Sequence, residues 1–441
     1  MERQYKDSGI EWIGKIPETW EVNRFKNKFK TGKGLNITKG DLVSEGIPVI
    51  SYGQVHSKKN TGTHLDDFLI RYIPSDLAKD GLSSKVSVGD FIFADTSEDI
   101  DGCGNAVFVD KEIGLYAGYH SVIAFAKNPK ESKYLAYQFL TECWRSQIRM
   151  RVTGIKVFSI SQAILNDTTI ILPPSAEQQR IADYLDEKCG EIDSLIGLQE
   201  QMIEKLKAYK QSVITEAVTK GLNPNAKLVP SGIDWIGDIP NDWIICKMHF
   251  CVKSIGDVDH FMPESVDIGI PYVMTRDLKD KSSQILLDSC KKISEDDYFI
   301  LSKKISVEKG DIIFARYATI GTVCLVDSDE RMIISYSCVI IKPKSNLNSS
   351  FLFYYLKSKI FEEEANKYIN TNIQGNIGID SLSKTNVLLP PLDEQQAIAS
   401  YLDSKCSEID KLIVVKQQKI EKLKDYKKSV IYEAVTGKTI L

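Results

Sequence analysis

The strongest constraint on the fold of this 441-residue chain is an internal repeat. Residues 8–20 read SGIEWIGKIPETW and residues 231–243 read SGIDWIGDIPNDW, with 9 of 13 positions identical. Residues 172–219 return as residues 389–436, with 33 of 48 positions identical and no gap. The stretches between these blocks barely match. Because a repeat overrides any estimate of domain number from length, we predict two modules of about 220 residues, each combining a shared scaffold with a divergent domain.

The composition is that of a soluble globular protein. Hydrophobic residues make up 43% of the chain and charged residues 26%, which allows a sizeable core. No run of about 18 apolar residues is present, so we expect no membrane span. The N-terminal sequence MERQYKDSG lacks the apolar region of a secretory signal. The net charge of −4 argues against a simple nucleic-acid coating protein, although local basic patches or basic partner subunits would still allow DNA binding.

The familiar sequence patterns of catalytic and metal sites are missing. The sequence has no phosphate loop, HExxH, GxSxG or strand-associated GxGxxG, so we do not expect an enzyme that acts alone. Its five histidines form no cluster with the spacing of metal ligands. Its nine cysteines, an odd number without CxxC pairs, indicate a reducing cytoplasm rather than a disulfide framework.

Each module begins with the WIG-containing block and continues into a divergent domain. Trp12, Ile13, Ile16 and Trp20 would form one apolar patch, for which we favour a role in the core or in domain packing. Short runs rich in Val, Ile, Phe and Tyr then lie between turn residues and predict strands. These runs are residues 47–52, 90–94, 106–109 and 121–126 in the first module, and residues 270–275, 311–315, 322–326 and 332–341 in the second. With helical segments expected at residues 133–149 and 349–367, the prediction is an α+β domain with a small mixed, mostly antiparallel sheet.

Each module ends in a long helix. Pro-Pro pairs at residues 173–174 and 390–391 stop the preceding strands, and Glu177 and Glu394 lie near the helix starts, where the helix dipole favours a carboxylate. Apolar residues recur every seven positions, which predicts that the two helices pair as an antiparallel coiled coil. The predicted seam residues are Leu185, Ile192, Ile196, Ile203, Leu206, Leu402, Ile409, Ile413, Ile420 and Leu423. The polar seam positions are Gln199 with Lys416, and Lys210 with Lys427.

The repeat predicts two pseudo-twofold halves with four segments. The first divergent domain is expected at residues 1–172 and the first long helix at residues 173–222. The second divergent domain is expected at residues 223–389 and the second long helix at residues 390–441. In such an arrangement the chain resembles a ring that has been cut once, so we expect its two ends to lie near each other.

Three motifs recur in the same order in both modules: WIGxIPxxW, then GDxIFA, then LPPxxEQQxIAxYLDxKxxEID. GDxIFA stands at residues 89–94 and 310–315, and the EQQ triplets stand at residues 177–179 and 394–396. Over essentially the whole chain, this order closely resembles that of the DNA specificity subunit of Type I restriction–modification systems. The LPP–EQQ–YLD element is the specific part of the resemblance, whereas the strand motif alone would be weak.

The resemblance implies a recognition function without catalysis. The divergent domains would be target recognition domains, each reading one half of a bipartite site on double-stranded DNA. The paired helices would act as a ruler and as the docking surface for two methyltransferase subunits, which bind S-adenosylmethionine and modify adenine after flipping it from the duplex. Motor/endonuclease (restriction) subunits would use ATP and Mg²⁺. The resemblance therefore implies no catalytic residue, metal or cofactor in this chain.

One segment departs from the family pattern. After GDFIFA, the first module continues with four acids in seven residues, Asp95, Glu98, Asp99 and Asp101. The family often has a basic or small residue soon after this motif, as the second module does with Arg316. The acids repel phosphate and argue against a DNA backbone contact here, although a carboxylate can accept a hydrogen bond from cytosine N4.

Polar and basic residues next to the predicted strands are the candidates for DNA contact. Arg and Lys can pair with guanine, and Asn and Gln with adenine, in the major groove, whereas phosphate contacts position the protein. For the first half-site we predict contacts by Gln54, His56, Lys58, Arg151 and Lys156, and for the second by Arg276, Arg316, Tyr317, Asn372 and Gln374. The alternative for each residue is an ordinary solvated loop.

Two other functions remain open at this level. The chain could be the recognition subunit of a methyltransferase-only system, which the sequence does not separate from a restriction system. It could also be a coiled-coil scaffold that joins two protein-binding domains and never touches DNA, and the acidic balance gives this alternative some support. Salt-dependent binding to duplex DNA in the presence of the methyltransferase partner distinguishes the scaffold from the specificity subunit.

Overall fold

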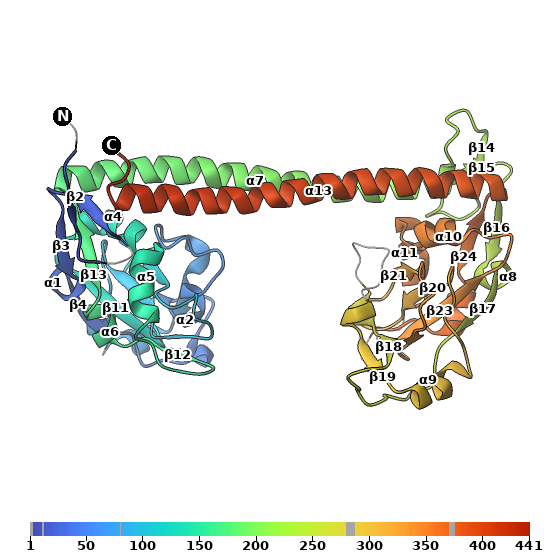
Figure 1. Cartoon of the computed structure of the whole chain (residues 1–441), viewed down its shortest axis with the longest axis horizontal. Coiled ribbons are helices and arrows are strands. Elements are labelled where there is room, and N and C mark those ends of the chain that lie inside the picture. Colours follow the sequence, from blue (N-terminus) through green and yellow to red (C-terminus); the bar gives the residue numbers. More distant parts are fainter. Residues whose placement is uncertain (1–2, 11–12, 80, 279–286, 370–374) are drawn as a thin grey trace. The chain divides into compact units, whose positions relative to one another are not determined.

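The computed structural model describes residues 3–10, 13–79, 81–278, 287–369 and 375–441. The chain divides into two compact units, the first made of Met1–Gln199 and Gln418–Leu441 and the second of Glu200–Gln417 (Figure 1). Each unit therefore contains one divergent domain and a segment of each long helix. The division into four segments stays a prediction.

The first unit is built on a four-stranded antiparallel sheet with the order β4-β11-β7-β9. A three-stranded sheet, β10-β5-β6, is mixed, because β10 pairs with β5 in parallel and β6 pairs with β5 antiparallel. Antiparallel two-stranded ladders join β1 to β2, β8 to β12 and β3 to β13. The strands are β1 (Tyr5–Asp7), β2 (Lys15–Pro17), β3 (Glu21–Arg24), β4 (Phe29–Lys33), β5 (Ile47–Ile50), β6 (Arg71–Ile73), β7 (Phe91–Ala94), β8 (Thr96–Ser97), β9 (Ala106–Phe108), β10 (Tyr116–Ala117), β11 (Ser121–Ala126), β12 (Phe158–Ser159) and β13 (Thr169–Leu172).

The second unit repeats this topology. Its four-stranded antiparallel sheet has the order β17-β23-β20-β21, and its three-stranded sheet, β19-β18-β22, again contains one parallel pair, β18 with β22. Ladders join β14 to β15 and β16 to β24. The strands are β14 (Leu228–Pro230), β15 (Asp238–Pro240), β16 (Ile244–Lys247), β17 (Val252–Gly256), β18 (Ile270–Val273), β19 (Lys291–Ile293), β20 (Ile312–Ala315), β21 (Val323–Leu325), β22 (Ile333–Ile334), β23 (Cys338–Pro343) and β24 (Asn386–Leu389). The predicted α+β class with mixed, mostly antiparallel sheets is thus confirmed in both units.

One predicted strand was wrong. The apolar run at residues 332–341 forms two strands in two different sheets rather than one. β22 pairs in parallel with β18, and the Ser335 N–H then donates to the Val273 carbonyl at 2.8 Å before the chain turns into β23. β22 and the first four residues of β23 are apolar and buried, so their pattern does not show that the two strands join different sheets.

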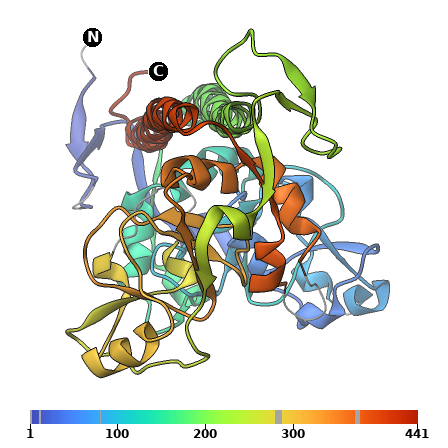
Figure 2. The same cartoon turned by 90° about the vertical axis from the view of Figure 1, so that its right-hand side faces the viewer.

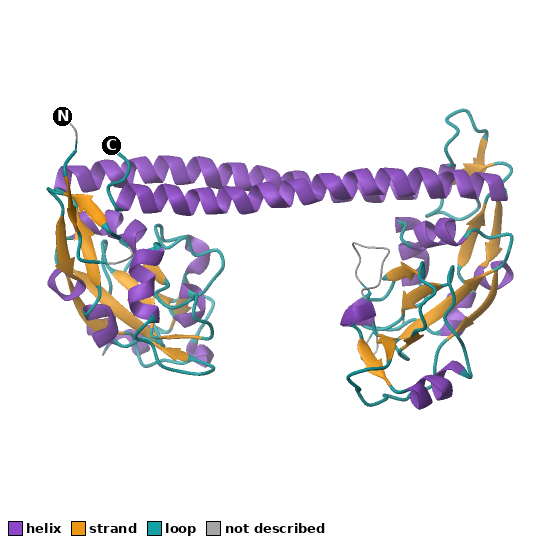
Figure 3. Ribbon diagram, in the orientation of Figure 1, coloured by secondary structure: helices purple, strands orange, loops and turns teal. Residues whose placement is uncertain are grey.

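Helices pack on the sheets of each unit (Figure 3). The two predicted helical segments each form two helices, α4 with α5 and α10 with α11. The break has a local cause in the second unit, where the Ser358 hydroxyl accepts a hydrogen bond from the Phe361 N–H and so caps a new helix. The α-helices are α1 (Phe25–Lys28), α2 (Tyr52–Val55), α3 (Ser75–Lys79), α4 (Pro129–Phe139), α5 (Glu142–Arg149), α6 (Gln162–Asn166), α7 (Ser175–Lys220), α8 (Met248–Cys251), α9 (Glu295–Ser302), α10 (Ser349–Leu356), α11 (Lys359–Asn366), α12 (Ile379–Ser383) and α13 (Leu392–Val435).

The repeated tryptophan of the WIG block anchors the start of each long helix. Trp20 is fully buried, and its indole N–H donates to the Glu177 carboxylate at 3.0 Å. Trp243 donates to Glu394 in the same way at 2.9 Å. Ile13 and Ile16 are also buried, so the block is part of the core as predicted, whereas Trp12 lies outside the described residues.

Within each unit, the segments of α7 and α13 run antiparallel. In the first unit, Asp193 of α7 and Lys427 of α13 form an ion pair at 2.7 Å. Farther along, Glu177 at the start of α7 and Gly437 just after α13 both lie against Trp20. In the second unit, Lys210 of α7 pairs with Asp410 of α13 at 2.7 Å, and these segments lie side by side in Figures 1 and 2.

The predicted seam residues are buried or half-buried. Two of the polar seam positions, Lys210 and Lys427, each have an aspartate partner on the other helix. Pairing of the two helices along their whole length as one coiled coil stays a prediction. The chain ends lie close together, as expected, because the Tyr5 hydroxyl donates to the Gly437 carbonyl at 3.2 Å.

Two further findings concern the cysteines and the length and polarity of the helices. Cys246 and Cys251 form a disulfide, which the scattered cysteine pattern did not indicate, and the other described cysteines are buried. In the described part of the chain, every helix is too short or too polar to cross a lipid bilayer.

Candidate nucleic-acid interface

The two units carry a topologically equivalent polar corner. We define the sheet corner as the residue directly after the GDxIFA strand together with the residue directly before its neighbouring strand. In the first unit these are Asp95 and His120, and the Asp95 N–H donates to the His120 carbonyl at 3.2 Å. In the second unit they are Arg316 and Ser337, joined by the same backbone hydrogen bond at 3.0 Å.

A second backbone contact confirms that the corners are equivalent. The Ile160 N–H donates to the Asp95 carbonyl at 2.7 Å, and the Ile377 N–H donates to the Arg316 carbonyl at 3.2 Å. Each donor precedes the short helix that leads to the last strand of its domain, α6 or α12. The fold therefore places different side chains at one shared backbone position.

The first corner brings together three segments that are distant in sequence. β8, directly after Asp95, pairs with β12 and so with the segment that contains Arg151 and Lys156. His56 reaches the same strand, because its Nε2 lies 2.9 Å from the Thr96 carbonyl. The two predicted DNA-contact segments of the first unit thus meet beside residues 95–101, which we call the acidic loop.

Two of the predicted contact residues have partners inside the chain. The Gln54 side-chain carbonyl accepts from the Ser51 N–H at 3.1 Å and caps α2. Both ring nitrogens of His56 have partners, Nε2 on Thr96 and Nδ1 on the Asn105 amide at 3.2 Å. These contacts favour a supporting role for both side chains.

The three basic candidates of the first unit are more accessible. Lys58 and Lys156 are exposed. The Arg151 guanidinium donates to the Gln147 carbonyl at 2.9 Å and lies 3.4 Å from the Asp167 carboxylate, but its side chain remains 41% exposed. All three can therefore reach an external anion.

Some carboxylates of the acidic loop have partners inside the unit. Asp95 contacts the Nδ1 atom of His120 at 3.2 Å, and Asp99 accepts from the Gly102 N–H at 2.6 Å. Asp101 lies 3.9 Å from Arg149 and is otherwise exposed. Burial raises the pKa of Tyr52, and the charges of Glu98, Asp99 and Asp95 raise it further, so the corner is rich in negative charge.

The second corner has the opposite composition. The Arg316 guanidinium lies 2.7 Å from the Asp257 carboxylate and donates through Nε to the Tyr336 carbonyl at 3.1 Å. Its side chain is only 11% exposed and lies over the ring of Tyr317, with 5.1 Å to the centroid. Asp257 also pairs with Lys304 at 2.7 Å. This buried network favours a structural role for Arg316.

The other candidates of the second unit differ in accessibility. Arg276 lies in the turn after β18, and its side chain is 69% exposed, with its Nε atom 3.8 Å from the Asp277 carboxylate. Tyr317 is half-buried and forms an isolated bridge with Asn376. Asn372 and Gln374 lie outside the described residues.

The GDxIFA motif itself is structural. Asp90 accepts backbone hydrogen bonds from Ser87 at 2.9 Å and Ala126 at 2.8 Å. Asp311 accepts from the Glu308 N–H at 2.8 Å and pairs with Lys342 at 2.7 Å. Burial raises the pKa of both carboxyl groups. The motif therefore builds the turn that leads into each corner strand.

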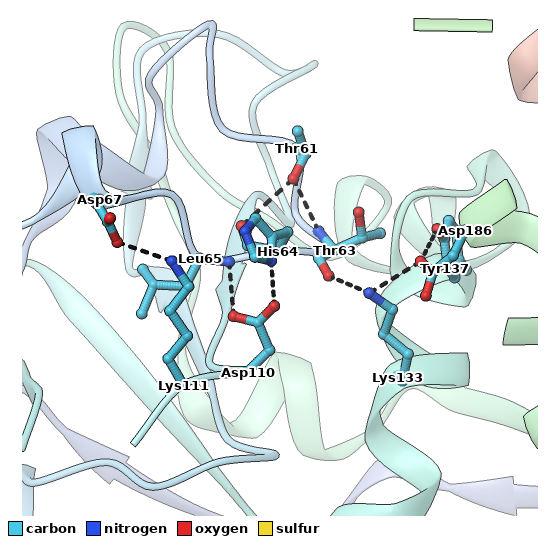
Figure 4. Close-up of polar contacts among 10 residues, drawn as sticks. All are labelled: Thr61, Thr63, His64, Leu65, Asp67, Asp110, Lys111, Lys133, Tyr137 and Asp186. Carbon is cyan, nitrogen blue, oxygen red and sulfur yellow. Dashed lines mark hydrogen bonds and ion pairs between the residues drawn. The ribbon is translucent and has the colours of Figure 1, made fainter. Parts of the chain in front are cut away.

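Each divergent domain is also tied to the YLD motif of a long helix. The Tyr137 hydroxyl of α4 donates to Asp186 at 2.5 Å, and the Tyr354 hydroxyl of α10 donates to Asp403 at 2.8 Å. Burial, followed by the carboxylate, raises the pKa of both tyrosines. In the first unit, Lys133 adds a bridge between Asp186 at 3.0 Å and the Thr63 carbonyl at 2.9 Å (Figure 4).

Two residues important to the geometry were not singled out from the sequence. His120 is exposed at the first corner, and Asp257 holds Arg316 at the second. The only sequence signal for His120 was its position directly before a predicted strand, and no sequence signal marked Asp257, which follows Gly256. In the described residues, no group of three or more His, Cys, Asp or Glu side chains could hold a metal ion.

The repeated α+β unit with one shared corner and two different sets of side chains defines a protein with two related, non-identical recognition domains. Residues 17–208 and 257–425 match the family described as the Type I restriction modification DNA specificity domain. Because this match covers more than half of the sequence, the chain belongs to that family.

Similar proteins support the same assignment along almost the whole chain. The MjaVIII specificity subunit of a Type I restriction enzyme from Methanocaldococcus jannaschii is 26% identical over 440 residues, covering 96% of this chain and 94% of the relative. The EcoKI specificity subunit from Escherichia coli K12 is 21% identical over 440 residues, covering 96% and 90%. A chain solved in work on complex assembly and conformational transition of the type I R-M system has the same fold, with a TM-score of 0.69, 17% identity and coverage of 96% and 99%.

Proposed function

We propose that this chain is the sequence-specific DNA-binding subunit of a Type I restriction–modification complex. Each divergent domain reads one half of a bipartite target. The observation that carries the proposal is the pair of equivalent corners, Asp95 with His120 and Arg316 with Ser337. Specificity comes from side chains that reach base edges. Two domains that recognise different sequences therefore need the same backbone geometry with different side chains.

The proposed DNA contacts follow the accessibility of the side chains. In the first domain, Lys58, Arg151 and Lys156 contact DNA, while Gln54 and His56 shape the surface beneath them. In the second domain, Arg276 makes the main base contact, and further contacts come from Tyr317, Asn372 and Gln374. Arg316 stabilises the sheet corner. An exposed arginine can form a bidentate pair with guanine O6 and N7.

The chain acts in this proposal without chemistry of its own. Two methyltransferase subunits supply S-adenosylmethionine and modify adenine, and restriction subunits supply ATP- and Mg²⁺-dependent translocation and cleavage. The names of the relatives, specificity subunits of Type I restriction enzymes, support this division of labour. The paired long helices set the spacing between the two half-sites and dock the methyltransferase subunits, and the complex works in the cytoplasm.

The test is DNA binding by the chain together with its methyltransferase partners. Affinity for the bipartite duplex should fall steeply with salt, because phosphate contacts release counterions, and it should exceed affinity for unrelated duplexes by at least about 1000-fold. Mapping of methylated adenines should give a motif in two parts. Binding that depends on neither salt nor sequence would contradict the proposal.

Replacing Arg276 by alanine should relax one position of the second half-site. Loss of a bidentate guanine pair costs about 1–3 kcal/mol of discrimination against the wrong base. The matched control is Arg331→Ala, since Arg331 is also a half-exposed arginine of the second unit but pairs with Glu295 at 2.6 Å. The control should leave the methylation motif unchanged, and an equal effect of both variants would refute the assignment of Arg276.

A further inference from the structure

A residue with a strained backbone lies at the sheet corner of the first unit and another lies next to the sheet corner of the second. Among the described residues, His120 (φ 50°) and Ala318 (φ 58°) are the only residues other than glycine with positive φ. His120 belongs to the first corner, and Ala318 lies two residues after Arg316 in the second. A side chain in this conformation costs free energy and persists where the surroundings hold it, commonly at ligand-binding sites.

The imidazole of His120 is held in place while remaining accessible. Its Nδ1 atom lies 3.2 Å from the Asp95 carboxylate, and the His120 side chain is 62% exposed. Its ring centroid lies 6.0 Å from that of Tyr119 and 6.3 Å from that of Tyr52. These contacts limit the orientations of the ring, which lowers the conformational entropy that is lost on binding.

The partner of His120 determines which hydrogen bond the outer nitrogen can make. An ionised carboxylate only accepts, so Nδ1 carries the proton that is donated to Asp95. The other ring nitrogen of the neutral imidazole, Nε2, is then an acceptor. With Glu98 and Asp99 nearby, the corner offers acceptors and repels phosphate. Its complement on DNA is a donor on a base edge.

We propose that His120, oriented by Asp95, is a specificity-determining residue of the first domain and accepts a hydrogen bond from an exocyclic amino group in the major groove. Cytosine N4 and adenine N6 are the amino donors exposed there. This inference rests on the proposed DNA-reading function and names the base chemistry that one position of the first half-site requires. At the equivalent position of the second domain stands Ser337, so the same requirement does not apply to the second half-site.

The decisive variant is His120→Gly in the full chain, assembled with its methyltransferase partners. Glycine adopts φ 50° without strain, so the variant removes the imidazole and keeps the backbone. Mapping of methylated adenines should show that one position of the first half-site, restricted to cytosine or adenine in the wild type, accepts other bases. Discrimination there should fall about 5- to 100-fold, and the second half-site should stay unchanged. Asp95→Ala should relax the same position less strongly.

The matched control uses the second histidine–aspartate pair of the same domain. His64 also contacts an aspartate, Asp110, but lies near the contacts that tie the domain to α7 (Figure 4). His64→Ala should leave the motif unchanged. Relaxation by His64→Ala equal to that by His120→Gly would overturn the assignment, because any disturbance of the domain would then give the same result.

Other outcomes separate this inference from the proposed function. If the wild-type complex gives a bipartite motif and His120→Gly leaves every position of it unchanged, the role of His120 is refuted while the proposed function stands. A uniform loss of methylation without altered base preference would mean a phosphate contact, which also refutes base reading. A wild-type complex without any sequence preference would refute the proposed function itself.

Discussion

The first and second units use one architecture with constant contacts at the long helices and different contacts at the sheet corner. Trp20 donates to Glu177 and Trp243 donates to Glu394 at nearly the same distance. The corner instead holds an exposed histidine–aspartate pair in the first unit and a buried arginine–aspartate pair in the second. The comparison shows that the repeat preserves the attachment of each domain to the helices and varies the surface that each domain presents.

The first prediction concerns the constant part and carries the largest expected effect. Trp20→Ala removes a fully buried indole and leaves the Glu177 carboxylate with Arg3 as its remaining side-chain donor. It should lower the free energy of unfolding by about 3–5 kcal/mol. Trp243→Ala should have an effect of similar size, since its contact is the same. Denaturant unfolding of the full chain measures both effects. If either variant lowered the free energy of unfolding by less than about 1 kcal/mol, the two tryptophan contacts would not be equivalent.

The second prediction separates structure from reading within the second unit. Arg316→Ala leaves Asp257, whose side chain is 12% exposed, with Lys304 as its remaining ionic partner and should cost about 1–3 kcal/mol of stability. Arg276→Ala removes an exposed side chain and should change stability by less than about 0.5 kcal/mol. Thermal unfolding distinguishes the two. If Arg316→Ala were as stable as the wild type, Arg316 would again be a candidate for a base contact.

The third prediction uses a natural difference between the units. The buried Gln147 accepts from the Thr169 N–H at 2.7 Å and donates to the Thr169 carbonyl at 3.0 Å. At the equivalent place the buried Glu364 accepts from the Asn386 N–H at 2.9 Å, and its other oxygen has no hydrogen-bond partner among the described residues. Glu364→Gln replaces this oxygen by a donor and should stabilise the protein by about 1 kcal/mol.

Gln147→Glu is the reciprocal change and should destabilise the protein by a similar amount, since it replaces a satisfied donor by an acceptor. Unfolding midpoints at one protein concentration measure both variants. Destabilisation by Glu364→Gln would show that the two positions are not equivalent.

The sequence was sufficient for the scaffold because the scaffold is repeated. The matched blocks predicted two units, two long helices and the core role of the WIG block, and the structure agrees for Ile13, Ile16 and Trp20. The change of sheet at residues 332–341 was missed, because the buried apolar residues of β22 and β23 do not show which neighbouring strand each one pairs with.

The candidate site was less predictable than the scaffold. Gln54, His56 and Arg316 have residue types that can read bases, but each has a partner inside the chain. The partner of Arg316, Asp257, comes from a strand end that lies far away in the sequence, and residue type alone does not identify such a partner. His120 was not among the candidates, because no local sequence pattern shows that a histidine will adopt a positive φ.

The central claim is that each domain reads its own half of the DNA target. The most direct test is to map methylated adenines for complexes that carry His120→Gly, Arg276→Ala or both. We expect His120→Gly to relax one position in one half-site and Arg276→Ala to relax one position in the other half-site. The double variant should show both changes. Relaxation of the same half-site by both single variants, or of neither half-site, would contradict the central claim.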